Sequence, residues 1–235
     1  MARDVEHLVQ QALTRWEAAR KFEARGDLRH AFWAYSKGIG ALLSYLRLTD
    51  RSRLVPVHHA MGTMCREIVS VAVRRGSTQE ALQHARMGLA ATHFAAPSAS
   101  RPEQVRQLLQ APTEDPMFQR VIGGQGPPLT APALLTAAAE SRLMLAGLLH
   151  AHPGRQAGDR WTIGTGARVS YPAYLTRYRW AVLPSCAGMD DAAEMRQLAV
   201  EAVLIYDELC RSANGPETSV RRAVETLARV EGVGL

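Results

Sequence analysis

The sequence predicts an all-α protein made of antiparallel helical hairpins, arranged as an irregular α-solenoid or bundle. Apolar residues recur at three- and four-residue steps along most of the 235 positions, which is the spacing of one helical face. Glycine followed by a polar residue separates successive stripes, at Gly26–Asp27 and again at Gly76–Ser77. Two helices joined by so short a turn must lie antiparallel and bury their apolar faces against each other. β-like or irregular character is confined to one short segment near residues 160–170.

The first hairpin covers residues 8–46 and has the clearest pattern. Glycine at position 26 tolerates the left-handed conformation that closes a helix, and the aspartate after it can accept hydrogen bonds from the amides that open the next helix. Small and large side chains alternate across the two predicted helices, and such alternation packs a seam densely. We expect five residues to pack this seam: Trp16, Ala19, Phe22, Ala31 and Tyr35.

These positions resemble a tetratricopeptide repeat (TPR), with Gly38 as a third small residue and Leu43 where the family has a proline. The resemblance implies a TPR-like scaffold that binds other proteins. The first 75 residues are also similar to the three-helix microtubule-interacting-and-transport (MIT) domains, because the second helix carries a comparable alanine and tyrosine pattern. An MIT-like chain would pack its third helix in the groove of the first two and bind helical peptide motifs on the remaining face.

Further helices are predicted after the first hairpin. A third helix opens near Pro56 and breaks at Gly76, and Ser77 with Glu80 forms a capping box for a fourth helix over 78–92. Proline and glycine residues bound the other periodic stretches, which predict helices over 102–110, 132–149, 170–182, 190–213 and 216–230. Because residues 123–128 are a glycine- and proline-rich linker, we divide the chain into N-terminal hairpins over 1–95, a linker with one short helix over 96–130, and a C-terminal helical region over 131–235.

Composition predicts an intracellular protein without a membrane span. Apolar residues make up 47% of the chain and can supply a sizeable core. No uninterrupted apolar run reaches the length of a spanning helix. Cys65, Cys186 and Cys210 are scattered and odd in number, which argues against a disulfide framework and favours a reducing compartment, in the cytoplasm or on the matrix side of mitochondria.

The distribution of charge favours oriented docking or self-association. All but two of the 28 basic residues are arginine. Either the arginines bind phosphate and carboxylate groups, or their excess reflects a genome rich in arginine codons. Residues 1–189 are basic and residues 190–235 are acidic, so the two ends of the chain differ in charge. We expect four arginines to contact a partner: Arg25, Arg29, Arg177 and Arg179.

No motif predicts catalysis, a metal ion or a cofactor. His58, His59 and Cys65 share one predicted helix, but no HExxH or CxxC cluster accompanies them. Cys186 lies in a predicted loop, and with a histidine of 150–152 as its base it is the basis of an enzyme alternative. Nothing in the sequence brings the thiol and such a base together.

RNA is the alternative partner, through residues 155–180. Five arginines are interleaved there with five aromatic residues and opposed by a single aspartate. Cationic side chains for phosphates and aromatic faces for bases are what single-strand binding requires. Tyr171, Tyr174 and Tyr178 are also spaced for one buried helical face.

We therefore expect a non-catalytic protein–protein interaction scaffold, an accessory or adaptor subunit whose partners are other proteins of a larger assembly. Two alternatives stay open. One is an RNA-associated subunit of a ribonucleoprotein particle, and the other is an MIT-like adaptor that binds helical peptide motifs.

Overall fold

The computed structural model describes residues 3–48, 55–96, 101–110, 129–154, 160–163, 177–212, 224–225 and 228, and it confirms the all-α fold class. The α-helices are α1 (Arg3–Ala24), α2 (Leu28–Leu48), α3 (Val55–Arg74), α4 (Thr78–Ala95), α5 (Pro102–Gln110), α7 (Ala131–Ala151) and α9 (Asp191–Arg211). A short 3₁₀ helix, η1, spans Pro184–Cys186. Two short strands complete the described elements: β1 (Trp161–Thr162) and β2 (Ala181–Val182).

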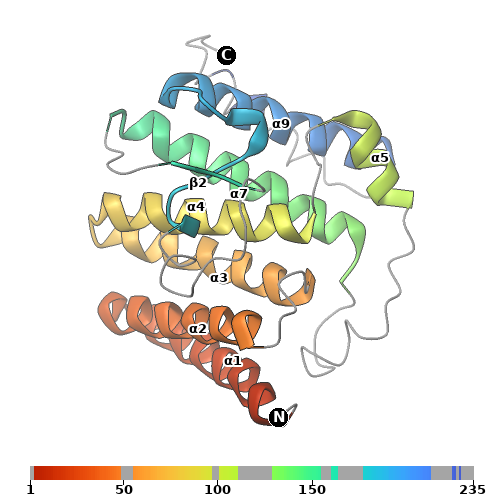
Figure 1. Cartoon of the computed structure of the whole chain (residues 1–235). Helices are drawn as coiled ribbons and strands as arrows, with labels where there is room; N and C mark the ends of the chain where they lie inside the picture. Colours follow the sequence, from red (N-terminus) through yellow and green to blue (C-terminus); the bar gives the residue numbers. More distant parts are fainter. Residues whose placement is uncertain are drawn as a thin grey trace.

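The helices stack as neighbouring pairs (Figure 1). α1 packs along α2, α3 along α4 and α7 along α9, and the contacts of α2 with α3 and of α4 with α7 join one pair to the next. α5 lies against α9 and α7 at one edge of the stack. The packed pairs confirm the predicted architecture, because each amphipathic helix buries its apolar face against a neighbour.

Both predicted glycine turns are present. Gly26 has a φ of 76° and Gly76 a φ of 72°, in the left-handed region where a residue with a Cβ is strained. The Asp27 carboxylate accepts a hydrogen bond from the His30 amide at 3.2 Å, as expected of the residue that precedes α2.

The capping box predicted at Ser77 is wrong. Ser77 occupies the N-cap position of α4, but its side chain makes no capping hydrogen bond. The amide of Ser77 already donates to the Ala72 carbonyl at 2.9 Å, which closes α3, so it is not available to the Glu80 side chain. Glu80 pairs with Arg75 at 3.4 Å instead.

Glycines also lie where helices approach closely. A Cβ added to Gly62 of α3 would lie 2.9 Å from Cγ2 of Thr92 in α4, a separation that real side chains do not adopt. A Cβ on Gly38 of α2 would lie 3.3 Å from the Ala12 carbonyl oxygen of α1. The third small position predicted for the first hairpin therefore lies where α1 and α2 cross.

One hydrophobic core runs from α1 to α9, and a smaller cluster joins α5, α7 and α9. α7 contributes to both, and it is the one described helix that is long and apolar enough to cross a membrane. Because 56% of its apolar window is buried inside the protein, α7 has the character of a core helix. The division of the chain over 96–130 stays a prediction, since 111–128 lies outside the described residues, as does most of the helix predicted over 216–230.

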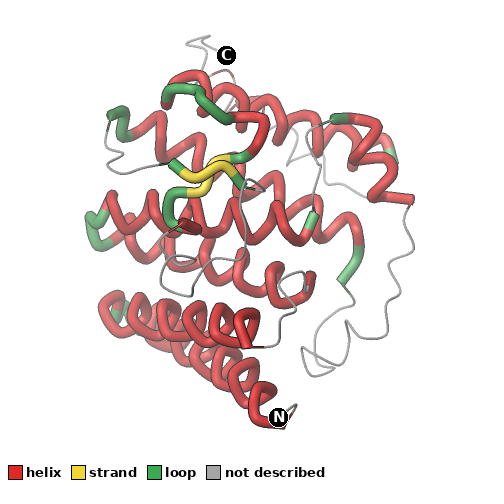
Figure 2. Tube along the Cα trace, viewed as in Figure 1, coloured by secondary structure: helices red, strands yellow, loops and turns green. Residues whose placement is uncertain are grey.

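β1 pairs with β2 in parallel, which confirms the predicted β-like character near 160–170 (Figure 2). The helix predicted over 170–182 is wrong at its end, because the backbone is helical at 177–178 and extended at 181–182. A short apolar run does not distinguish a helix from a buried strand by its periodicity. Tertiary pairing decides here, since the Ile163 amide donates to the Val182 carbonyl at 2.9 Å and β2 packs against α4.

Candidate functional site

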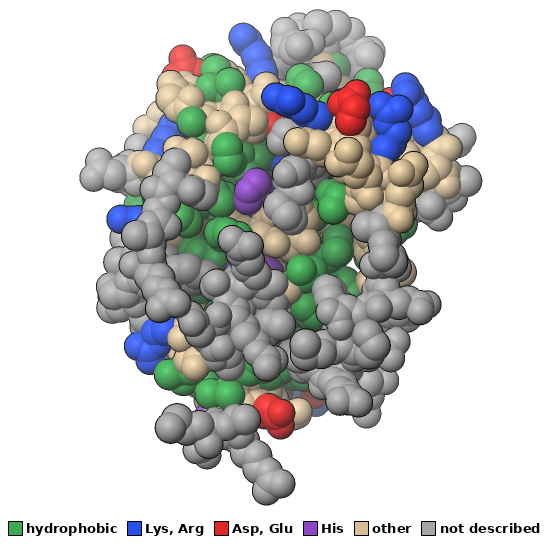
Figure 3. Space-filling model, turned by 45° about the vertical axis from the view of Figure 1, so that its right-hand side comes forward, with side chains coloured by type: hydrophobic (Ala, Val, Ile, Leu, Met, Phe, Trp, Pro, Cys, Tyr) green, Lys and Arg blue, Asp and Glu red, His purple; other side chains and the backbone are tan. Residues whose placement is uncertain are grey.

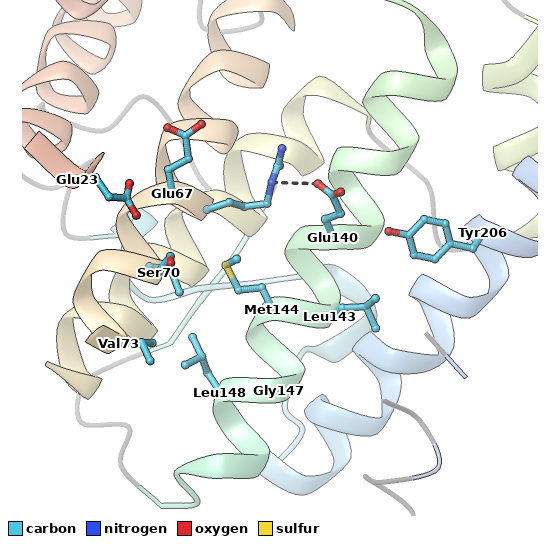
Figure 4. Close-up of a pocket in the computed structure, with 12 residues that line it drawn as sticks. Glu23, Glu67, Ser70, Val73, Glu140, Leu143, Met144, Gly147, Leu148 and Tyr206 are labelled. Atoms are coloured by element: carbon cyan, nitrogen blue, oxygen red, sulfur yellow. Dashed lines mark ion pairs between the residues drawn. The ribbon is translucent and has the colours of Figure 1, made fainter. Parts of the chain in front are cut away.

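A groove crosses one side of the stack between α3 and α7, with a volume of about 660 Å³. Figure 4 shows these two helices as its walls, with Glu23 of α1 at one end and Tyr206 of α9 at the other. α4 separates the two walls in the sequence, so the groove exists only once the helix pairs have stacked.

Apolar side chains line most of the groove. Leu143, Met144 and Leu148 of α7 lie across from Val73 of α3, which is 50% exposed and leaves the groove open to solvent (Figure 4). Gly147 lies in the α7 wall, and a Cβ added there would meet no atom within 4 Å. Apolar side chains are also visible over the middle of the face drawn in Figure 3, so apolar exposure alone does not mark a site. The groove combines apolar exposure with concavity.

Three glutamates edge the groove, and all of them are paired. The ion pairs join Glu67 to Arg20 at 2.5 Å, Glu23 to Arg74 at 2.9 Å and Glu140 to Arg66 at 3.2 Å. The side chains of Arg20 and Arg74 are 57% and 46% exposed, so these pairs are screened by water and contribute little to stability. Their charges remain accessible to a bound segment.

The glutamate edge also ties α1 and α2 to α3. Glu67 accepts a hydrogen bond from the Trp16 indole nitrogen at 2.6 Å, and Glu23 accepts one from the Tyr35 hydroxyl at 3.1 Å. Burial, with the nearby carboxylates of Glu67 and Glu23, raises the pKa of Tyr35 far above its ordinary value. Tyr35 is therefore a neutral donor that positions the edge, and it has no acid–base role at physiological pH.

The five residues predicted to pack the first hairpin lie in or beside its core. Ala19, Ala31 and Tyr35 are buried, while Trp16 and Phe22 are partly buried and pack against the same cluster. Trp16 also contacts the edge of the groove, through the hydrogen bond that its indole nitrogen donates to Glu67 of α3. The sequence pattern did not indicate this contact.

The four arginines predicted to contact a partner are exposed, but none of them lines the groove. Arg25 and Arg29 flank the turn between α1 and α2, and Arg177 and Arg179 lie just before β2. Burial lowers the pKa of His84 in α4, and the charge of Arg179 adds to this shift, so Arg179 lies on the α4 side of the stack.

Two side chains of the predicted RNA-binding stretch serve the protein itself. Tyr178 is buried and stacks on Trp161 with 6.1 Å between the ring centroids. Arg160 forms an ion pair with Asp191 at the start of α9. Residues 164–176 lie outside the described residues, and RNA contact through 155–180 stays a prediction.

The burial of Cys186 weighs against its role as a nucleophile in the enzyme alternative. Cys186 is buried, and burial raises the pKa of its thiol to about 12, with the carboxylates of Glu201 and Glu194 adding to the shift. A thiol with that pKa is protonated at neutral pH and is a poor nucleophile. Within the described ranges, no group of three His, Cys, Asp or Glu residues could hold a metal ion, and this includes the histidines and Cys65 of α3.

α9 carries a row of buried glutamates that its apolar stripe conceals. This glutamate row consists of Glu194, Glu201 and Glu208, which are seven residues apart and at most 5% exposed. Each glutamate meets an arginine from a different helix: Arg86 of α4 at 2.7 Å, Arg142 of α7 at 2.8 Å and Arg106 of α5 at 3.7 Å. A spacing of seven residues is two helical turns, so the three carboxylates share one face of α9.

The glutamate row explains part of the charge asymmetry of the sequence. Arg86 holds Glu194 with two hydrogen bonds, at 3.0 and 2.7 Å, and it also donates to the Ala181 carbonyl of β2 at 2.8 Å. Acidic residues of the last fifth of the chain are therefore internal counter-ions of the basic body. The sequence signal was present, because glutamates seven residues apart within an apolar stripe must face the core with it.

Comparison of the chain with known protein families, with curated proteins and with solved structures finds no match. The structure by itself establishes an all-helical protein with packed helix pairs. A relationship to TPR or to MIT domains is not shown by these comparisons and remains a hypothesis.

Proposed function

We propose that the protein is a non-catalytic interaction scaffold that holds an amphipathic helical segment of a partner subunit in the groove between α3 and α7. The groove carries this proposal because it is concave, open at the surface and apolar along its α7 wall. A partner helix would lay its apolar face on such a surface, which is a common mode of peptide recognition.

The charged edge supports the same function. Glu140 is 44% exposed at its side chain and Arg66 is 15% exposed, so both signs of charge border the apolar wall. A partner with polar residues on either side of its apolar stripe would find ion-pair partners at both edges, and this sets the register of binding. A small-molecule site would instead be more enclosed, with polar groups that converge on one point.

The arrangement of helices favours a TPR-like scaffold over an MIT-like adaptor. α3 forms a second pair with α4, and α7 with α9 extend the stack further, whereas an MIT-like bundle is complete with three helices. All three cysteines are free thiols, which agrees with an intracellular, reducing location.

Gly147 provides the test. A Cβ added at Gly147 meets no atom within 4 Å, so a Gly147→Trp substitution would place its indole in the groove. Replacing a helical glycine by a residue with a side chain also favours the helix. Gly147→Ala is the matched control, because a methyl group leaves most of the groove empty. The measurement is native purification of each tagged chain, with quantitative mass spectrometry of the proteins that accompany it.

We expect a partner that accompanies the natural chain and Gly147→Ala but is lost from Gly147→Trp. Thermal melts would show that all three chains are folded. A solitary monomer without a partner, or the same partners on Gly147→Trp, would overturn the proposed function.

A further inference from the structure

The outer face of α2 forms a second surface, separate from the groove. Trp33 is 48% exposed there, although a large aromatic residue usually packs inside a protein. Arg29 and Lys37 are each four residues away and exposed, so the three side chains lie in one line along the helix. α2 contains no aspartate or glutamate between Leu28 and Leu48.

Two cationic side chains lie over the Trp33 ring. The Arg15 guanidinium of α1 lies 5.0 Å from the ring centroid, and the Lys37 ammonium lies 5.9 Å from it. Both distances are within the range of a cation–π interaction. An arginine held over an aromatic face keeps its N–H donors for a second ligand, so the ring orders these charges without neutralising them.

Many arginines elsewhere in the described structure pair with carboxylates, as in the glutamate row and at the groove edge. In the described ranges, no carboxylate lies within ion-pair distance of Arg15, Arg29 or Lys37. Asp27, two residues before Arg29, pairs with His30 at 2.7 Å, and its charge also interacts with that of Arg29 from beyond ion-pair distance. This face of α2 therefore presents positive charge that makes no direct ion pair within the described ranges.

We propose that this cationic face (Arg15, Arg29, Trp33 and Lys37) docks an acidic segment of a partner protein. Tryptophan and arginine are the side chains that most often dominate a protein interface, and carboxylates complement the cations around them. A protein segment fits better than RNA, because single-strand binding uses aromatic faces for base stacking and here cations lie over the ring of Trp33.

A synthetic peptide tests the proposal on the full chain. The probe is a fluorescein-labelled peptide of 16 residues, glutamate throughout except for leucine at every fourth position, and binding is followed by fluorescence anisotropy. We expect saturable binding, and an affinity at least tenfold lower for Lys37→Glu and for Arg29→Glu. Trp33→Ala removes the ring that orders the cations, and we expect a loss of about fivefold or more.

Arg196→Glu is the matched control, because Arg196 is exposed on α9 and the substitution changes the net charge by the same amount. We expect it to bind the peptide like the natural chain. Gly147→Trp should also bind normally, so failure of this proposal is distinguishable from failure of the groove.

Three outcomes of the peptide experiment would overturn the proposal, and a fourth comes from native mass spectrometry. The first three are no binding to the natural chain, equal losses for Lys37→Glu and Arg196→Glu, and tighter binding of a uridine oligonucleotide of the same length with the same dependence on Trp33. Dimerisation in native mass spectrometry that is abolished by Trp33→Ala would equally overturn it, because a second copy would then cover the cationic face.

Discussion

Cys186 shows how burial decides the chemistry of a single side chain. Its sulfur lies in η1 beside Ser185, at 3.9 Å from the hydroxyl, in a loop where a reactive thiol would be expected to be exposed. Burial raises the pKa of the thiol to about 12, and it does the same for Cys65. Both thiols are therefore fully protonated at physiological pH, whereas Cys210 is partly exposed.

We expect iodoacetamide at pH 7.5 to modify Cys210 in the folded protein while Cys65 and Cys186 stay intact. Peptide mass spectrometry would report each site, and the same reaction in denaturant would label all three as a control. Rapid labelling of Cys186 in the folded chain would contradict this account and would restore the enzyme alternative.

At the scale of the element, α9 depends on the glutamate row. Glu194→Ala would leave Arg86, which is 1% exposed, without its carboxylate partner. We expect the free energy of unfolding to fall by about 3–5 kcal/mol, because a buried charge without a partner is strongly unfavourable. Denaturant unfolding followed by circular dichroism measures the difference.

Two further variants show whether the cost comes from the uncompensated charge. Asp207 pairs with Arg211 on the exposed side of the same helix, so Asp207→Ala should cost at most about 0.5 kcal/mol. The double substitution of Arg86→Met with Glu194→Leu should recover much of the lost stability, since it removes both charges. Our account would be wrong if Glu194→Ala unfolded at the same denaturant concentration as Asp207→Ala.

The elements were easier to predict from the sequence than the contacts between them. Gly26 and Gly76 marked two turns correctly, because a residue that must adopt positive φ is visible in the sequence itself. β2 was missed because its pairing with β1 depends on a partner about 20 residues away. The groove was missed for the same reason, since Val73 and Leu148 come together only through the stacking of helix pairs.

At the scale of the whole molecule, buried histidines make stability depend on pH. Burial lowers the pKa of His59, His84 and His93 to about 4, from an ordinary value near 6.5. Between these two values the unfolded chain binds more protons than the folded one. The stability that these groups confer is therefore complete above about pH 6.5 and is lost as the pH falls toward 4.

We expect each histidine to cost about 1–2 kcal/mol of stability at pH 5 relative to pH 7. Thermal melts at several pH values would record the fall in Tm. The neutral His84 ring donates a hydrogen bond from Nδ1 to the Glu80 carbonyl oxygen at 2.8 Å. His84→Asn can retain a donor there while removing the titration. The slope of Tm against pH should flatten by about one third in His84→Asn. It should stay unchanged in His150→Asn, where the histidine is exposed. Identical slopes for both variants would contradict the assignment.

The bond between Arg86 and Glu194 also bears on how the chain is made. It joins residues 108 positions apart, and a ribosome adds about 5–20 residues each second, so the glutamate emerges roughly 5–20 s after the arginine. α4 lacks α9 for the whole of that interval, and it also lacks α7 and β2 in the earlier part, so its inward face is at first open to water. The nascent chain therefore exposes apolar surface for several seconds, and chaperones have time to bind it before the C-terminal helices cover that face.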